Sequence, residues 1–273
     1  NNINLLEPVG QFGSRLEGGK DAAQPRYIHT HLSNLAMKIY DKRDEPLLKM
    51  MMDDGQKVEP EYYMPILPMI LVNGASGIGT GWSTDIPCYN PKDIIENMEC
   101  YLQGKEMYPM IPWYQGFHGR IIKTGPTTYI SKGRFTIHGD TIEITELPVQ
   151  SWTDKYKEFL ESIIIENTKT DKKKGTNLIR YYDSYSTDSR VHFILYFPKG
   201  VLDNPKWKKI VNEDAYVTNL ERTLKLVGTI NTSNMNYYNV DGVITKSTDP
   251  RDMLKGYMDA RIKLYGKRKK HIL

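Results

Sequence analysis

The sequence contains only two cysteines, Cys88 and Cys100, among its 273 residues. Two cysteines cannot form a disulfide framework or a cysteine-rich zinc site, and we expect both thiols to stay reduced, which disfavours a secreted protein. The chain also lacks an apolar run of the roughly 20 residues that cross a bilayer. Its longest apolar stretch, residues 64–72, is interrupted by Pro65 and Pro68, which excludes a transmembrane helix.

A strong charge of either sign is missing as well. Lys and Arg number 37 against 33 Asp and Glu, a net charge of +4, which permits a polyanionic partner without requiring one. Basic residues form short runs at 169–174, 206–209 and 267–270, of a kind usually found on solvated surface. With 39% hydrophobic and 26% charged residues, the composition is that of a globular protein, which excludes a disordered or fibrous chain.

Signals for metal and nucleotide sites are weak. No Asp-x-Asp pair accompanies a Glu-Gly-Asp segment, so no two-metal carboxylate site is evident. His29 and His31 form an isolated pair, which is more often structural than metal-binding. Residues 74–81 hold four glycines, but their spacing is not G-x-G-x-x-G, and residues 83–87 do not begin a helix that could bind a pyrophosphate. A nucleotide-binding enzyme is therefore disfavoured.

The chain divides into three sections of different texture. Residues 1 to about 91 are rich in Gly, Pro and Met, and their pattern predicts one amphipathic helix over residues 31–40 among loops and short strands. From about 92 to 248 strand signals dominate. The expected strands are 119–123, 128–130, 134–137, 140–147 and 191–197, with a hairpin turn at 138–140.

Two further helices are expected. The first covers residues 152–166, where Ser151 and Asp154 resemble a capping box. The second begins with Asp249 as N-cap and Pro250 in the first turn. Its apolar stripe comprises Met253, Leu254, Tyr257, Met258, Ile262 and Tyr265. This helix is still running at Leu273 and the first residue is not Met, so we expect the chain to be a piece of a longer protein.

Ile78 is the unusual residue of the glycine-rich segment, because it is bulky and stands between Gly77 and Gly79. An apolar side chain on a thin loop can enter between base steps and kink a duplex. It can equally fill a core beneath a tight turn. The spacing alone leaves both interpretations open.

Arg26 and Tyr27 follow a glycine-rich, basic segment. Pro25 favours an extended backbone at Gln24 and predicts a loop here rather than a helix. A phenolate can attack a phosphodiester and be held as a phosphotyrosine ester, while a neighbouring guanidinium stabilises the charge on the phosphoryl oxygens. With 19 Tyr in the chain, spacing alone favours a structural role for any one of them.

Several linked segments carry a family resemblance. They are residues 1–6, 10–16, 18–23, 25–28, 53–56, 58–61, 65–69, 73–75, 77–83 and 144–149. In this order they resemble the breakage-reunion region of eukaryotic-type (type IIA) DNA topoisomerase II. The resemblance runs from Asn1 through the final helix and is one of fold only between about 168 and 214.

The resemblance implies roles for individual residues. Tyr27 would be the nucleophile that forms a 5′-phosphotyrosyl bond with cleaved DNA, and Arg26 would stabilise the transition state. Ile78 would be the wedge that bends the duplex. Trp152 matches a position that meets DNA.

One continuous segment also matches DNA-contacting positions, and its backbone and polar side chains can hold phosphates without selecting a sequence. It comprises Lys225, Leu226, Val227, Gly228, Thr229, Ile230, Asn231, Thr232, Ser233 and Asn234. Lys20 and Arg15 are weaker candidates for phosphate contacts.

The implied fold class is α/β (mixed α+β). Residues 1–91 would be the C-terminal part of a winged-helix domain, 92–248 a β-rich tower domain, and 249–273 the start of a coiled coil leading to the C-gate. The implied function is that of an ATP-dependent type II topoisomerase, which passes one duplex through a transient double-strand break in another.

The resemblance also implies cofactors, partners and location. Mg²⁺ and ATP would both be bound by domains outside this chain, so the isolated piece should be inactive. Double-stranded DNA and a second copy of the protein would be its partners, without a membrane. The location would be the nucleus or, for a viral source, the host cytoplasm or the virion.

Three positions depart from the family's pattern without removing a catalytic group. Gln24 stands where a small residue is common, His29 replaces an aromatic residue, and Ser76 replaces an acidic one. A non-catalytic DNA-bending module is the alternative function, although bending does not need the Arg26-Tyr27 pair. A bacterial gyrase-like protein is a narrower alternative, which the glycine-rich and Arg-Tyr segments match less closely.

Overall fold

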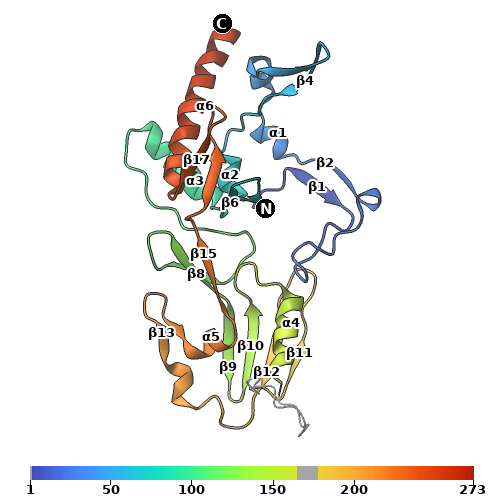
Figure 1. Cartoon of the computed structure of the whole chain (residues 1–273), viewed down its shortest axis with the longest axis vertical. Coiled ribbons are helices and arrows are strands. Elements are labelled where there is room, and N and C mark those ends of the chain that lie inside the picture. Colours follow the sequence, from blue (N-terminus) through green and yellow to red (C-terminus); the bar gives the residue numbers. More distant parts are fainter. Residues whose placement is uncertain (1, 165–177) are drawn as a thin grey trace. The chain divides into compact units, whose positions relative to one another are not determined.

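The computed structural model describes residues 2–164 and 178–273 (Figure 1). The chain forms two compact units, each assembled from separated segments. Unit 1 comprises residues 1–7, 30–115 and 231–273, and unit 2 comprises residues 8–29 and 116–230. The segment that carries Arg26 and Tyr27 thus belongs to unit 2.

Unit 1 combines two-stranded antiparallel ribbons with helices. Its elements are β2 (His29–Leu32, beginning one residue before the unit), α1 (Ala36–Ile39), η2 (Lys42–Leu47), β3 (Met50–Asp53), β4 (Gln56–Pro60), α2 (Met69–Val72), β5 (Ala75–Ile78), β6 (Ser83–Ile86), α3 (Pro91–Leu102), β16 (Met235–Tyr238), β17 (Ile244–Ser247) and α6 (Pro250–Ile272). β3 pairs with β4, β5 with β6, and β16 with β17. Leu71 of α2, Ile94 of α3 and Leu254 of α6 are fully buried in one core.

Unit 2 is built on a four-stranded antiparallel sheet of order β11-β12-β10-β9. Its elements are η1 (Pro25–Tyr27), β7 (Arg120–Lys123), β8 (Thr128–Lys132), β9 (Arg134–His138), β10 (Thr141–Glu146), α4 (Thr153–Ser162), β11 (Tyr181–Ser184), β12 (Phe193–Tyr196), η3 (Pro205–Lys208), β13 (Ile210–Asn212), β14 (Val217–Thr218), α5 (Asn219–Thr223) and β15 (Val227–Asn231, whose last residue belongs to unit 1). β1 (Leu6–Val9), which pairs with β2, spans the boundary between the two units in the sequence.

The core of unit 2 follows from the alternation of its strands. Ile142 and Ile144 of β10 are buried while Glu143 between them is not, because successive side chains of a strand point to opposite faces. Tyr156 and Leu160, one helical turn apart on α4, are buried in the same core. The Tyr156 hydroxyl donates to the Leu224 carbonyl at 2.8 Å, and burial raises the pKa of this phenol.

Most expected strands are confirmed. β7, β8, β9, β10 and β12 lie within or overlap the five expected segments. The expected turn joins β9 to β10, with His138 opposite Thr141 and Gly139 at φ 60°. The Asp249 carboxylate accepts from the amide of Arg251 and caps α6 as expected.

The helix expected over residues 31–40 is wrong. Residues 29–32 form strand β2, and α1 is a single turn, Ala36–Ile39. Ser33 separates them: its hydroxyl donates to the Asn4 carbonyl and accepts from the Ala36 amide. The helical periodicity lost because β1 supplies a strand partner from a distant part of the sequence.

The expected start of α4 is also wrong. The helix begins after Trp152, and no side chain caps it. Its first amides instead donate to main-chain carbonyls, Thr153 to Arg15 and Asp154 to Leu16. The helix ends at Ser162, and the expected continuation to 166 and the basic run at 169–174 fall largely or wholly outside the described residues.

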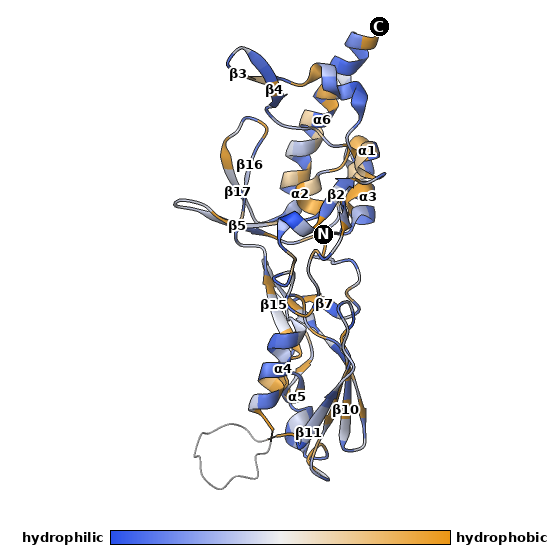
Figure 2. Cartoon of the chain, turned by 90° about the vertical axis from the view of Figure 1, so that its right-hand side faces the viewer, coloured by the Kyte–Doolittle hydropathy of each residue, from blue (hydrophilic) through white to orange (hydrophobic). Residues whose placement is uncertain are grey.

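α6 departs from its expected stripe in its second half. Met253, Leu254 and Met258 are buried, but Ile262 and Tyr265 are exposed and Arg261 is buried instead. The last turns of α6 are mostly hydrophilic (Figure 2). Within the described residues, no helix is long and apolar enough to cross a membrane.

Candidate nucleic-acid interface

Tyr27 lies at the end of the single 3-10 turn η1, with 68% of its surface exposed. Pro25 occupies the first position of this turn, where its fixed φ is favourable and no amide is needed. The expectation of an extended Gln24 is confirmed by φ −60° and ψ 144°, whereas the expected loop is a short helical turn. The Tyr27 amide donates to the Gln24 carbonyl at 2.9 Å, so the phenol is presented to solvent on an ordered turn.

The Arg26 guanidinium is held near this phenol. Its Nη2 donates to Oε1 of Gln24, and its Cζ lies 5.5 Å from the centroid of the Tyr27 ring. At this distance a guanidinium interacts favourably with an aromatic face. Gln24, which departs from the family's pattern, thus orients the cation beside the candidate nucleophile.

The loop that precedes Tyr27 is ordered by its own hydrogen bonds. The Asp21 carboxylate accepts from the amide and the hydroxyl of Ser14, and these bonds hold the pKa of Asp21 below its ordinary value. The Gly19 amide donates to the Ser14 carbonyl at 3.0 Å, and the Ala23 amide donates to the Gln11 carbonyl at 2.9 Å. Residues 11–23, which we call the anchor loop, therefore form a defined structure.

The anchor loop is attached to α4 and β10 within unit 2. Besides the carbonyls that accept from the first amides of α4, the Arg15 guanidinium forms an ion pair with Glu146 at the end of β10. Trp152 packs on Gly18, since a Cβ on Gly18 would lie 2.2 Å from the indole Cε2. The sequence predicted neither contact.

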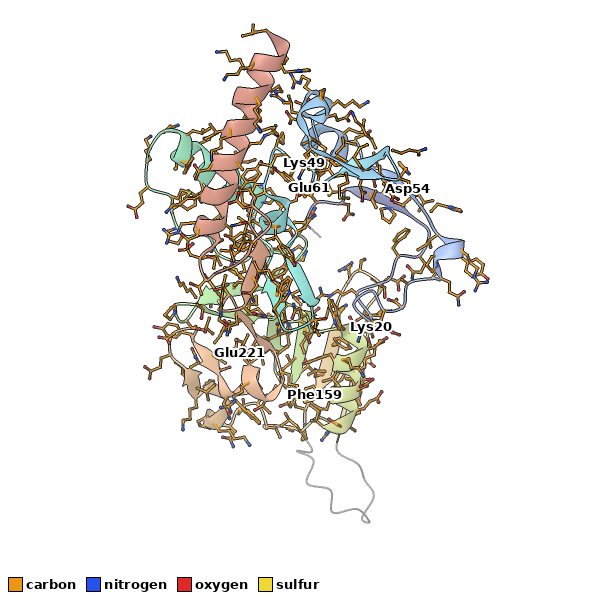
Figure 3. The ribbon with its side chains drawn as sticks, turned by 45° about the horizontal axis from the view of Figure 1, so that its top comes forward. Lys20, Lys49, Asp54, Glu61, Phe159 and Glu221 are labelled. Carbon is orange, nitrogen blue, oxygen red and sulfur yellow. The ribbon has the colours of Figure 1, made fainter. Side chains whose placement is uncertain are left out.

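These contacts change the expectation for Arg15. Its charge is neutralised by Glu146, so the structure supports an anchoring contact rather than the expected phosphate contact. Lys20 on the same loop is exposed (Figure 3). Trp152 is half-buried, and one side of its indole is taken up by Gly18.

Ile78 lies at the tip of the β5–β6 hairpin in unit 1, with 96% of its surface exposed. It pairs with Ser83 in the hairpin register, and the Gly79 amide donates to the Trp82 carbonyl at 2.8 Å to close the turn. Trp82 supports the turn from below through an edge-to-face contact with Tyr238, with ring centroids 5.7 Å apart. The alternative of a core-filling isoleucine is therefore wrong.

The hairpin is braced by the segment that leads into β16. Asn234 donates from its side-chain amide to the Ser83 hydroxyl at 3.0 Å, and Asn236 donates to the Ser83 carbonyl at 2.7 Å. The Asp85 amide donates to the Asn234 carbonyl at 2.8 Å. Asn234, expected to contact DNA, is thus engaged in holding the wedge hairpin.

Two other members of the expected DNA-contacting segment are corrected by the structure. Leu226 is buried in the core of unit 2, and Thr232 is buried with its hydroxyl donating to the Thr248 carbonyl. Neither side chain can reach a duplex without unfolding. Lys225 is exposed, with its Nζ 4.2 Å from the centroid of the Phe159 ring (Figure 3).

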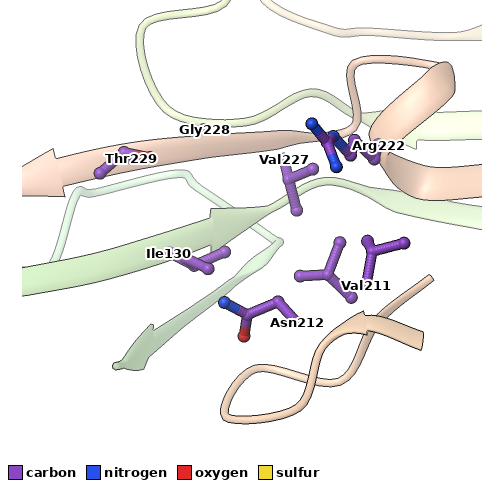
Figure 4. Close-up of a pocket in the computed structure, with 8 residues that line it drawn as sticks. Ile130, Val211, Asn212, Arg222, Val227, Gly228 and Thr229 are labelled. Carbon is purple, nitrogen blue, oxygen red and sulfur yellow. The ribbon is translucent and has the colours of Figure 1, made fainter. Parts of the chain in front are cut away.

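β15 also forms one wall of a cavity of about 250 Å³ in unit 2 (Figure 4). The lining residues are Ile130, Val211, Asn212, Val217, Arg222, Val227, Gly228 and Thr229. This wall is mainly apolar, which does not suit a phosphate. The segment's exposed members are Lys225, Thr229, Asn231 and Ser233.

No cluster able to hold a metal occurs in the part of the chain that the structure describes. No three His, Cys, Asp or Glu side chains within residues 2–164 and 178–273 are grouped for this purpose. His29 and His31 are both exposed on strand β2.

Comparison with known proteins places the chain in a family. The family model for the A-type chain of DNA gyrase/topoisomerase IV matches residues 1–273. Chicken DNA topoisomerase 2-alpha is 41% identical and Plasmodium falciparum DNA topoisomerase 2 is 43% identical, each over the whole of this chain. The chain spans only 17% and 18% of the length of these relatives.

A solved structure agrees with these relatives. The crystal structure of the Plasmodium falciparum topoisomerase II DNA-binding, cleavage and re-ligation domain matches with a TM-score of 0.88 and 42% identity. The match covers all of this chain and 35% of that one. The chain therefore belongs to the DNA gyrase/topoisomerase IV family, and it is similar over its whole length to the breakage-reunion region of eukaryotic-type topoisomerase II.

Proposed function

We propose that this chain carries the DNA-cleaving side chain of an ATP-dependent type II topoisomerase. The observation that carries the proposal is the exposed phenol of Tyr27 on an ordered turn, beside the Arg26 guanidinium, in a chain that the family model matches throughout. The whole enzyme would break both strands of one duplex, pass a second duplex and religate the first.

The chemistry is a reversible transesterification. The Tyr27 Oη attacks a backbone phosphorus, the bond from phosphorus to the 3′-oxygen breaks, and the phenolic proton is released as the 3′-oxygen gains one. Arg26 stabilises the negative charge on the phosphoryl oxygens. Attack by the 3′-hydroxyl on the phosphotyrosyl bond reverses the step, so no phosphodiester energy is lost.

DNA binding would rest on groups from both units. Ile78 would enter between base steps and bend the duplex. Lys20, Trp152 and the exposed members of the 225–234 segment would contact the backbone without selecting a sequence. Salt-sensitive binding with little sequence preference is the expected behaviour.

The remaining parts of the activity are proposed to lie outside this chain. Mg²⁺ and ATP would be bound by other domains, Mg²⁺ by an acidic domain of the partner in a homodimer. We also propose the winged-helix, tower and coiled-coil assignment of residues 1–91, 92–248 and 249–273, and a nuclear location. In a virus the location would be the host cytoplasm or the virion.

A cleavage assay tests the proposal. The full-length protein with Mg²⁺, a cleavage-stabilising poison and plasmid DNA should yield protein-linked 5′ ends after denaturation, and Tyr27→Phe should yield none while still binding DNA. DNA bending by the wild type without any adduct would instead support the alternative, a non-catalytic DNA-bending module.

A further inference from the structure

Glu146 is a buried carboxylate whose oxygens are all engaged. It is 4% exposed. Its Oε1 accepts from the Leu147 amide at 3.0 Å and from Nη2 of Arg15, and its Oε2 accepts from the His118 amide at 3.1 Å. Burial of a carboxylate is costly unless it is paired and hydrogen-bonded, so these three donors define one position for it.

The strand around Glu146 aims this carboxylate at the anchor loop. The β9–β10 register shifts between Ile144 and Glu146, an irregularity of the kind that redirects a side chain. A Cβ on Gly133 would lie 2.4 Å from the Glu146 carbonyl oxygen, so the neighbouring chain approaches this backbone closely. The place of Glu146 is therefore set by the core sheet of unit 2.

Arg15 is held on three sides. Its amide donates to the Asp188 carbonyl at 2.7 Å, its carbonyl accepts from the Thr153 amide, and its guanidinium pairs with Glu146. From Arg15 the order continues along the anchor loop through the bonds of Gly19 and Ala23 to the turn that begins after Gln24. Tyr27 is thus connected to the core sheet through Arg15.

We infer that Glu146 is a positioning residue for Tyr27, acting through Arg15 and the anchor loop. The inference rests on the proposed function. Attack on phosphorus requires the reacting atoms to be closely aligned, and a displacement of about 1 Å can lower a rate roughly 100-fold. Removing the Glu146 charge leaves the Arg15 guanidinium unpaired and loosens the loop, while the exposed DNA-contacting groups stay in place.

The test compares Glu146→Gln with Glu158→Gln in the full-length protein with Mg²⁺ and DNA. Both changes remove one carboxylate charge from unit 2, but Glu158 pairs with Lys155 on the exposed surface of α4. We expect Glu146→Gln to slow adduct formation on saturating DNA by roughly 10- to 100-fold with a less than about twofold change in DNA affinity. Glu158→Gln should match the wild type.

Two readouts separate positioning from a general loss of structure. Arg15→Gln combined with Glu146→Gln should be no slower than either single variant, since both remove the same contact. Amide exchange should accelerate at Gly19 and Ala23 while the β10 and β12 amides stay protected. If Glu146→Gln loses cooperative unfolding, Arg15→Gln removes the same ion pair from the loop side and replaces it.

The outcomes are distinguishable from those for the proposed function. Adduct formation by Tyr27→Phe would overturn the proposed function itself. Loss of the adduct in Tyr27→Phe together with wild-type cleavage rates in both Glu146→Gln and Arg15→Gln would overturn only the positioning role. Strictly additive effects of the two single variants would overturn it as well.

Discussion

Arg261 on α6 and Asp44 on η2 form a buried ion pair, with Nη1 and Oδ2 2.7 Å apart although 217 residues separate them in the sequence. Arg261 is 2% exposed and also donates to the Met64 carbonyl. Arg268, two turns further along α6, contacts both Asp44 and Asp41. An ionic network therefore joins the second half of α6 to the rest of unit 1 where an apolar stripe was expected.

Asp44→Asn should destabilise unit 1 strongly. The change leaves the buried Arg261 without its counter-charge, which typically costs about 3–5 kcal/mol. Glu61→Gln is the matched control, because its pair with Lys49 lies on the exposed β3–β4 hairpin (Figure 3) and should contribute less than about 1 kcal/mol. Urea unfolding measures both, and equal costs would contradict the assignment.

Ile78→Ala should reduce DNA bending without affecting the fold. The side chain makes no core contact, so the free energy of unfolding should stay within about 0.5 kcal/mol of the wild type. The bent fraction of a duplex labelled for energy transfer should fall roughly tenfold, which corresponds to about 1.4 kcal/mol. Val58→Ala, another exposed apolar residue of unit 1, should leave bending unchanged.

Gly18→Ala should cost more than Gly19→Ala. Both glycines have positive φ, so each substitution carries a backbone penalty of about 1–2 kcal/mol. A Cβ on Gly19 meets open space, but one on Gly18 displaces the Trp152 indole, adding about 1–3 kcal/mol. Urea unfolding followed by tryptophan emission should show this difference, and Trp152→Ala should abolish it.

The anchor loop should loosen at acid pH. The pKa of Asp21 is lowered in the folded state by hydrogen bonds from Ser14, so its stabilising contribution is present above the ordinary value of 3.8 and is lost as pH falls through the lowered pKa. A carboxyl-carbon NMR titration should give a midpoint below 3.8. Ser14→Ala should raise that midpoint, whereas Ser162→Ala on the exposed side of α4 should not.

Ser76→Glu restores the acidic residue common in the family but should weaken the wedge hairpin. Ser76 lies directly opposite Asp85 in the β5–β6 register, and like charges in that arrangement cost roughly 0.2–1 kcal/mol. Adding Asp85→Asn should recover the loss in thermal unfolding. A cleavage profile that differs from the wild type in Ser76→Glu, and persists in the double variant, would assign the effect to DNA contacts.

Local signals in the sequence were sufficient for much of unit 2 and for the start of α6. The strands around the turn at Gly139 were predicted because alternation and turn residues act within a few positions. The same holds for Asp249, whose carboxylate caps the helix two residues away. The family and the candidate nucleophile were also evident, since linked motifs occur in one order along the chain.

Tertiary structure decided what depends on distant partners. Residues 29–32 became a strand because β1 pairs with them, and α4 starts on carbonyls of the anchor loop rather than on Ser151. The sequence determined where Tyr27 and Ile78 stand in the chain and that Tyr27 follows Arg26. Only folding decided that Glu146, 131 residues from Arg15, neutralises it, because a buried charge selects its partner in space rather than along the chain.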